Sequence, residues 1–366
     1  MQPKMSFATV VFGGEVPLLE LQARSLAKFL DPSLVDQILV LVNDTSDVKV
    51  SRKLRDILAA YGPLADKVVI KTGDDLFAKP AVRHISAWSL DVLKLYLPSF
   101  LQSWRNAGWR GLSGWRMQQA FKLAAGGLID SPYLVILDAK NVFLRPIGPQ
   151  DFVHDDGRPL ARFEQLGGIS TPWMSASLKA VGSELSVADI TNVTQFITPF
   201  SVRTSLLRET VQTMERTGGP VQLQFLPKKN HPTEFMALNA CCYDARGTIE
   251  EDFAPGLVDQ VSLFLSMSDD QIDERLAAAK QRDAFCLSLH SAVIGRFSPE
   301  QMQGFAETLV SKGIVGDEGE AKAALGRVAQ LNKKRTAWSR RRAEANKAAL
   351  SRNATSDSSI KLGGAE

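Results

Sequence analysis

The stretch from Gly114 to Pro146 constrains the fold of this 366-residue chain more strongly than any other. Its first part has apolar residues at the three- and four-residue spacing of one buried helix face: Met117, Ala120, Phe121, Ala124 and Leu128. Gly126-Gly127 then predicts a left-handed exit from the helix. The run from Tyr133 to Leu137 is continuously apolar, which is typical of a strand covered on both faces.

This strand ends at a carboxylate, Asp138, followed by Lys140 and Asn141. Open α/β sheets bind their ligands beyond the carboxyl ends of the strands. The other face of the preceding helix carries four side chains at helical spacing: Trp115, Gln118, Gln119 and Lys122. We therefore expect a binding site around Asp138.

Three more short apolar runs precede this stretch, at Phe7–Phe12, Gln37–Val42 and Lys67–Lys71. Helical patterns lie between them, and Lys53–Tyr61 is one of these. Strands that alternate with helices indicate βαβ units and a mostly parallel sheet, so the predicted class is α/β. Residues Ala81–Trp109 are also predicted to be helical, covering the sheet.

Two polar turns follow the first two predicted strands. Gly13-Gly14 ends the first, but a dinucleotide fingerprint needs three spaced glycines, so classical NAD binding is disfavoured. Gly13 would still let a nucleotide approach the backbone closely. Asn43 and Asp44, after the second strand, either contact a base or ribose or simply form the turn.

Composition narrows the class of protein. Apolar residues make up 45% and charged residues 23%, which are ordinary globular values. The net charge of +3 gives no argument for a nucleic-acid partner, and we expect none. The cysteines Cys241, Cys242 and Cys286 have neither zinc-type nor disulfide-framework spacing. Without a signal peptide or an apolar run of about 20 residues, the expected location is cytoplasmic.

The C-terminal part is expected to be a helical extension. Ser298-Pro299-Glu300 is a strong helix start, and the chain beyond Asp317 is rich in Ala, Lys and Arg. Its basic segment, Lys333–Arg342, either contacts an acidic membrane surface or belongs to a solvated helix. The predicted divisions are a main domain at 1–297, a basic helical extension at 298–345 and a disordered tail at 346–366.

Several blocks, taken in order, resemble bacterial glycosyltransferase-like proteins of the GT-A class, in particular a poorly characterised family. They are GWRMQQAFKL…YLVILDAKNVFLRP, then TPFSVRTSLLRE with a helix predicted over Val202–Thr217, then TEFMALNACCY, then the strand ending Leu289-His290-Ser291. The resemblance implies a GT-A-like core. It also implies transfer of a sugar from a nucleotide-sugar donor to a saccharide acceptor, with a role in surface polysaccharide synthesis.

In such enzymes an Asp-x-Asp pair holds a divalent cation that neutralises the leaving diphosphate. Carried onto this chain, Asp138 is the first carboxylate and Lys140 stands at the second position. A lysine ammonium has no lone pair for a metal. In the interpretation that we favour, Lys140 replaces the metal as a fixed positive charge. In a second reading, Asp138 with Asn141 and His290 still holds Mn²⁺ or Mg²⁺, and in a third the fold binds sugar nucleotides without catalysis.

The resemblance also implies roles for other side chains. Gln118, Gln119 and Lys122 would hydrogen-bond the donor sugar or phosphates from the helix, or else form an exposed surface. Glu234 is the candidate base that activates the acceptor hydroxyl, although Thr233-Glu234 is also an ordinary helix start. A nucleotidyltransferase is a further alternative, but Gly13-Gly14-Glu15 lacks the Lys or Arg usual beside a phosphate-binding loop.

Overall fold

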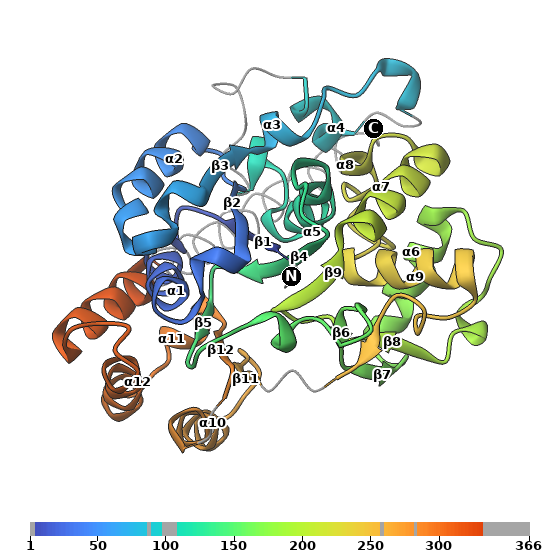
Figure 1. The fold of residues 1–366 in the computed structure, drawn as a ribbon. Coiled ribbons are helices and arrows are strands. Elements are labelled where there is room, and N and C mark those ends of the chain that lie inside the picture. The colour runs from blue at the N-terminus through green and yellow to red at the C-terminus, as the bar shows by residue number, and fades with distance from the viewer. Residues whose placement is uncertain (1–3, 86–88, 97–107, 257–259, 282–283, 332–366) are drawn as a thin grey trace, which may run out of the picture.

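The computed structural model describes residues 4–85, 89–96, 108–256, 260–281 and 284–331. At its centre lies a five-stranded sheet of order β3-β2-β1-β4-β9. The strands are β1 Met5–Val11, β2 Val35–Val42, β3 Val68–Thr72, β4 Tyr133–Asp138 and β9 Phe200–Arg203. The first four are parallel, and β9 is antiparallel to β4. The predicted α/β class with a mostly parallel sheet is confirmed (Figure 1).

Helices cover both faces of this sheet (Figure 1). On one side lie α1 Val16–Phe29, α2 Asp47–Asp56 and the 3₁₀ segment η2 Leu58–Lys67. On the other lie α5 Gly114–Ala124, α6 Ser170–Val181, α7 Thr204–Gly218 and α9 Glu234–Arg246. Along β1, Phe7 and Val11 enter the first core whereas Ala8 and Val10 enter the second. Because alternate side chains face opposite cores, the strands are apolar without interruption.

The strand order places a crevice beside β1. The chain moves outward from β1 to β2 and β3, and then returns to lay β4 on the other side of β1. Asp138 is paired in register with Val10 of β1. Such a reversal separates the loops at the carboxyl ends of the two central strands, and this is where open α/β sheets bind ligands.

A third core joins the C-terminal part of the chain to α1. It contains Leu18 and Leu21 of α1 together with a small sheet of order β11-β12-β5. Those strands are β11 Gln260–Leu263, β12 Cys286–Leu289 and β5 Asn141–Phe143, and the helices that pack on them are α10 Asp269–Gln281 and α12 Pro299–Ser311. Residues 318–331 are also helical. The predicted division at residue 297 stays a prediction, and Lys333–Arg342 and the tail at 346–366 lie outside the described residues.

The other elements are short. They are α3 Gly73–Leu76, α4 Leu90–Lys94, α8 Val221–Gln224, α11 Ser291–Ile294, β6 Leu160–Ala161, β7 Phe163–Gln165, β8 Asn192–Thr194 and β10 Ala254–Pro255, with 3₁₀ turns η1 Pro32–Leu34, η3 Val82–His84, η5 Trp109–Gly111, η6 Ala125–Leu128, η7 Pro149–Asp151 and η8 Val187–Asp189.

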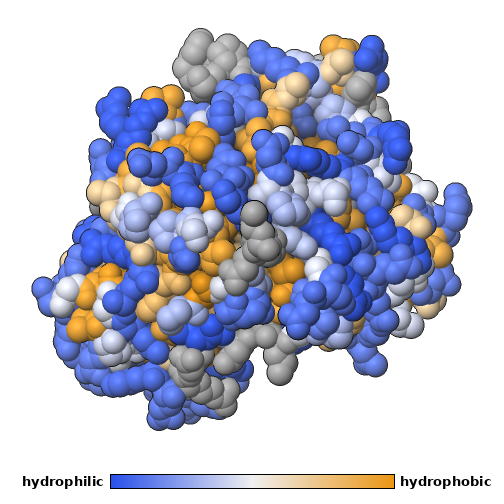
Figure 2. Space-filling view, viewed as in Figure 1, coloured by the Kyte–Doolittle hydropathy of each residue, from blue (hydrophilic) through white to orange (hydrophobic). Residues whose placement is uncertain are grey.

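The face of the molecule in Figure 2 is mostly hydrophilic, and apolar side chains show between polar ones near its middle. Among the described residues, no helix combines the length and the apolarity that a membrane crossing requires.

Three predicted helices need correction. In the described part of Ala81–Trp109, only η3 and the short α4 are helical before η5 begins at Trp109. The helix predicted at Lys53–Tyr61 begins earlier as α2 and gives way to η2, where Gly62 has a positive φ and Pro63 follows it. The helix predicted from Val202 begins after β9, because that segment extends the sheet beside β4.

Gly126-Gly127 was expected to end its helix in a left-handed conformation, and this is wrong. Neither residue has a positive φ, since both lie in the 3₁₀ turn η6. A Cβ on Gly126 would lie 2.7 Å from Cβ of Leu207 on α7. Close packing between helices therefore explains this glycine. By contrast, the helix start at Ser298 is confirmed, because its hydroxyl accepts a hydrogen bond from the backbone N of Gln301 at 3.1 Å.

Candidate active site

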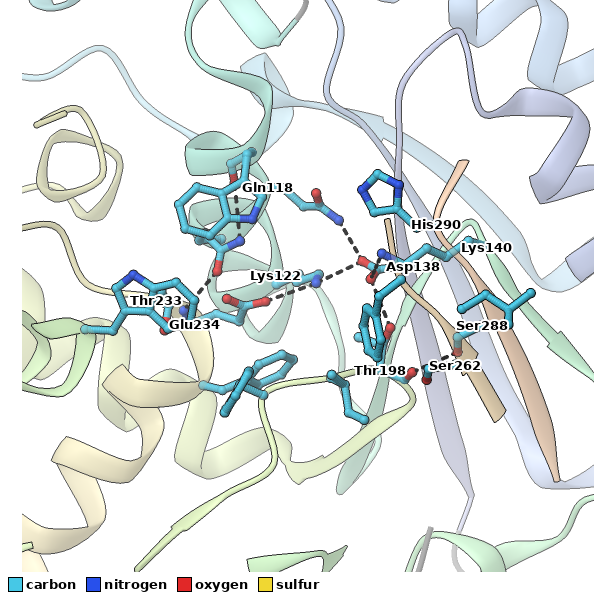
Figure 3. A pocket seen from close by; sticks show the side chains of 18 residues that line it. Gln118, Lys122, Asp138, Lys140, Thr198, Thr233, Glu234, Ser262, Ser288 and His290 are labelled. Carbon is cyan, nitrogen blue, oxygen red and sulfur yellow. Dashed lines mark hydrogen bonds and ion pairs between the residues drawn. The ribbon is translucent and has the colours of Figure 1, made fainter. Parts of the chain in front are cut away.

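Asp138 lies at the tip of β4 and is surrounded by donors (Figure 3). Its Oδ1 lies 2.9 Å from Nζ of Lys122 and accepts a hydrogen bond from Nε2 of Gln118 at 2.6 Å. Its Oδ2 lies 3.1 Å from Nζ of Lys140 and accepts from the hydroxyl of Thr198 at 3.0 Å. Both carboxylate oxygens are therefore fully engaged by the protein itself.

Lys122 also joins Asp138 to a second carboxylate, Glu234, because its Nζ lies 3.0 Å from Oε1 of Glu234. Lys122 comes from α5, Asp138 from β4 and Glu234 from the first turn of α9. We call Lys122, Lys140, Asp138 and Glu234 the four-charge cluster. Its formal charges cancel when all four groups are ionised.

Burial and pairing shift the pKa values in opposite directions within this cluster. Burial raises the pKa of the Asp138 carboxyl, but the ammonium groups of Lys122 and Lys140 outweigh burial and hold it well below its usual range. Burial lowers the pKa of Lys122, and the two carboxylates outweigh it, so this pKa is raised. The pKa of Glu234 is raised because burial exceeds the opposing effect of Lys122. Glu234 is thus the carboxylate of the pair that accepts a proton more readily.

The low pKa of Asp138 predicts a loss of stability in acid. Since the unfolded chain protonates this carboxyl near ~3.9, lowering the pH through that value favours the unfolded state. We expect the unfolding free energy of the wild type to fall more steeply between about pH 5 and pH 3 than that of Asp138→Asn. Urea titrations across this range measure the difference. Parallel curves for the two proteins would contradict the pairing.

The turn after β4 is held by buried amides. Asn141 is fully buried, and its Oδ1 accepts a hydrogen bond from the backbone N of Asp138 at 2.7 Å. Its Nδ2 donates to the carbonyl of Thr198 at 3.0 Å and to the hydroxyl of Ser288 at 2.6 Å. Gln22 of α1 donates from Nε2 to the carbonyl of Asp138 at 2.7 Å. These bonds fix the direction in which Asp138 leaves the sheet.

The donors expected for a metal do not fit a divalent cation in this arrangement. Both oxygens of Asp138 face ammonium groups or hydrogen-bond donors, and the amide of Asn141 already makes hydrogen bonds within the protein. Nδ1 of His290 accepts from the backbone N of Ala292 at 3.2 Å, where it caps α11. Across the part of the chain that the structure describes, no three His, Cys, Asp or Glu side chains gather as metal ligands would. Hard cations prefer several free oxygen ligands.

Two cavities adjoin the four-charge cluster. The first, of about 280 Å³, is lined by Glu234, Thr233 and four aromatic side chains besides Trp115: Trp173, Phe196, Phe235 and Phe264. We call it the aromatic cavity. The second, of about 310 Å³, lies at the carboxyl ends of β1 and β2 and is lined by Val10, Phe12 and Asn43, among others. We call it the strand-end cavity. Both share a wall made of Trp115, Gln118, Asp138, Lys140 and His290.

Several predicted site residues make hydrogen bonds that hold neighbouring segments together. Gln119 accepts at Oε1 from the backbone N of Glu234 at 3.4 Å and donates from Nε2 to the carbonyl of Trp115 at 3.3 Å. It thereby ties α5 to the start of α9. Asn43 donates to the carbonyl of Gly114 at 2.7 Å and accepts from the backbone N of Trp109 at 2.9 Å. Contact with a donor molecule stays a prediction for both.

Gly13 and Asp44 hold each other at the end of β1. Oδ2 of Asp44 accepts from the backbone N of Gly13 at 2.9 Å, and Oδ1 accepts from that of Ser46 at 2.8 Å. The described walls of the two cavities are formed without either residue. A Cβ on Gly13 would lie 3.0 Å from Cγ2 of Val50, so packing accounts for this glycine. The turn that was one of the two predictions for Asp44 is present.

Sequence reasoning placed Trp115 at the expected site but missed Thr198 and the other aromatic side chains of the first cavity. Trp173 belongs to α6, and Phe196 and Phe264 lie outside named helices and strands. No periodic pattern marks residues that meet only through tertiary structure. The one local signal was the pair of Thr-Pro steps, at Thr171-Pro172 just before Trp173 and at Thr198-Pro199 just before β9.

The fold and the site define an α/β protein with a lysine–carboxylate cluster at the reversal of its sheet. The chain belongs to a family of unknown function, DUF6492, whose model matches residues 11–243. No curated protein matches it.

Similar solved structures include the galactosyltransferase LgtC in complex with donor and acceptor sugar analogues. That chain is 11% identical, with 87% of this chain and 100% of that one covered and a TM-score of 0.40. The bifunctional glycosyltransferase WbbM is 11% identical, with coverage of 79% and 46% and a TM-score of 0.37. Mouse xyloside xylosyltransferase 1 is 10% identical, with coverage of 72% and 88% and a TM-score of 0.31.

Proposed function

We propose that this protein is a glycosyltransferase that moves a sugar from a nucleotide-sugar donor to a saccharide acceptor. The observation that carries the proposal is the four-charge cluster, which places Asp138 and Lys140 in the wall shared by two adjoining cavities and Lys122 and Glu234 in the wall of the aromatic cavity. A transferase must hold two substrates on either side of the atoms that react. The strand-end cavity would receive the nucleotide, as in other open α/β sheets, and the aromatic cavity would receive the acceptor.

The reaction can be assigned to groups of this chain. The acceptor hydroxyl oxygen attacks the anomeric carbon, and the bond from that carbon to the diphosphate oxygen breaks with its electron pair on the diphosphate. The hydroxyl proton passes to Glu234, whose raised pKa makes it a stronger base than an ordinary carboxylate. Lys140, with 28% of its side chain exposed and a place in both cavities, would balance the charge on the departing diphosphate. A single displacement of this kind inverts the anomeric centre.

Lys140 would act here in place of a divalent cation. We expect Lys140→Met to lower the rate of transfer about tenfold or more, because one preorganised positive charge at the leaving group is lost. Lys140→Arg keeps the charge and should retain most of the activity. Nucleotide-sugar turnover is measured with EDTA and with added Mn²⁺. Activity that EDTA abolishes and Mn²⁺ restores would overturn the proposed role of Lys140.

One observation favours a second candidate, a protein that binds sugar nucleotides without turning them over. Both oxygens of Asp138 are already paired within the protein, which is also what a site that has lost its chemistry would show. Thermal-shift measurements with a panel of nucleotide-sugars test binding, and release of the nucleotide diphosphate tests turnover. Stabilisation by a donor without any release, in the presence of varied saccharides, would select the binding protein.

Other expectations concern the setting of the reaction. The role in surface polysaccharide synthesis, the cytoplasmic location and membrane contact through Lys333–Arg342 stay predictions supported by the sequence alone. So does the expected lack of a nucleic-acid partner.

A further inference from the structure

We propose that the aromatic cavity is a subsite for a neutral pyranoside, stacked against Trp173 and Trp115 and hydrogen-bonded by Thr233. The inference rests on the proposed function, because it names the class of acceptor that the proposed transferase would use. It does not rest on turnover, because the subsite would bind the saccharide without a donor.

The aromatic wall of this cavity is unlike the packed core. Trp115 is 48% exposed, Phe264 43% and Phe196 36%, although large aromatic side chains usually bury most of their surface. The ring of Trp173 lies 6.0 Å from that of Trp115 and 6.0 Å from that of Phe196. Three neighbouring rings thus line the cavity beside the four-charge cluster, and the ring of Trp173 is tilted by 42° to that of Trp115 and by 80° to that of Phe196.

A pyranose ring matches such a surface. One of its faces presents C–H groups, which carry slight positive charge, and the face of an aromatic ring carries negative charge. Its rim presents hydroxyl groups, which need hydrogen-bond partners. The charges of the cluster cancel when all four groups are ionised, and His290 is the other titratable side chain among the described lining residues, so an uncharged sugar fits better than an acidic or basic one.

Thr233 supplies an independent reason to expect a ligand hydroxyl. It is 4% exposed and lines the cavity, and its Oγ1 finds no hydrogen-bond partner among the described residues. It occupies the N-cap position of α9, yet its side chain makes no capping hydrogen bond. A buried hydroxyl without a partner is costly, and a sugar hydroxyl in the cavity would remove that cost. A sugar bound there would lie beside Glu234, the next residue and the proposed base.

Ligand-observed NMR on the whole protein tests the subsite without any donor. The probes are the methyl α- and β-pyranosides of glucose and galactose, together with maltose and lactose, at millimolar concentrations. We expect at least one to bind and Trp173→Ala to weaken it about tenfold, whereas Trp173→Phe keeps a ring and most of the affinity. Thr233→Val, which removes only the hydroxyl, should also weaken it about tenfold, and Thr233→Ser should not.

Each contrary result has a distinct meaning. If no saccharide binds, or if Trp173→Ala binds as well as the wild type, the subsite is overturned even when nucleotide-sugars are turned over. Binding of octanol in competition with every saccharide would also overturn it, because the cavity would then be made for an alkyl chain. If saccharides bind as expected and no donor is ever turned over, the subsite stands and the proposed glycosyltransferase does not. Circular dichroism confirms that each variant is folded.

Discussion

Glu234→Gln is expected to lower the rate of sugar transfer by about 10³-fold, since general base catalysis contributes about 10² to 10⁴. The amide keeps the shape of the side chain but cannot take the proton of the acceptor hydroxyl. The fold should survive, because Lys122 keeps Asp138 as its partner at 2.9 Å. Burial already disfavours the ionised form of Glu234 and raises its pKa, so removing that charge costs the folded state little.

Steady-state kinetics at saturating donor and acceptor measure this loss, and equilibrium binding of the nucleotide-sugar should remain unchanged. Glu209→Gln is the matched control, since Glu209 lies on α7 and pairs with Arg246 at 2.7 Å, outside both cavity walls. In the wild type, kcat/KM should decline as the pH falls through the raised pKa of Glu234, because the base becomes protonated. Near-normal transfer by Glu234→Gln would remove Glu234 from the mechanism.

Lys122→Met is expected to lower the unfolding free energy by about 3 to 5 kcal/mol, the usual cost of removing one partner from a buried ion pair. Lys122 is 4% exposed and is the contact that joins Asp138 to Glu234. Without it, two buried carboxylates would lie close together, and Lys140, which pairs with Asp138, would be the remaining ammonium group of the cluster. Urea titration at pH 7, followed by circular dichroism, measures the loss.

Two further variants separate this effect from ordinary loss of packing. Lys140→Met should change the unfolding free energy by less than about 1 kcal/mol, because this lysine is partly exposed. Lys122→Met with Glu234→Gln should be more stable than Lys122→Met alone, since one unpaired charge has gone. This double variant also serves as the measurable protein if the single variant does not fold. Equal losses in the single and double variants would argue against charge as the cause.

The position of Asp138 could be predicted from the sequence because it depends on short-range signals. A continuous apolar run predicts a buried strand, and a charged residue directly after it must lie at the edge of the sheet. The polar face of α5 could be predicted for the same reason, because helical spacing places Gln118 and Lys122 together. Both residues do contact Asp138.

The pairing of Lys122 with Glu234 could not be predicted in this way. These residues are 112 positions apart, and their contact depends on how α5 and α9 pack against each other on one face of the sheet. The same holds for Asn141, which looked like a metal ligand from its place after the strand but turns inward to hold the backbone of Asp138. The strand β9 has four residues, too few for a period to separate it from the helix that follows.

The ion pair between Lys140 and Asp138 makes the carboxylate a resident counter-ion. In the proposed reaction, a diphosphate that reaches Lys140 would compete with an anion already held 3.1 Å from the ammonium group, so an exchange of partners would precede every productive encounter. Small anions with one charge gain little from such an exchange, and the cluster would thereby discriminate against them. After the proposed transfer, the same carboxylate would pair with Lys140 again, which would help the nucleotide product to leave.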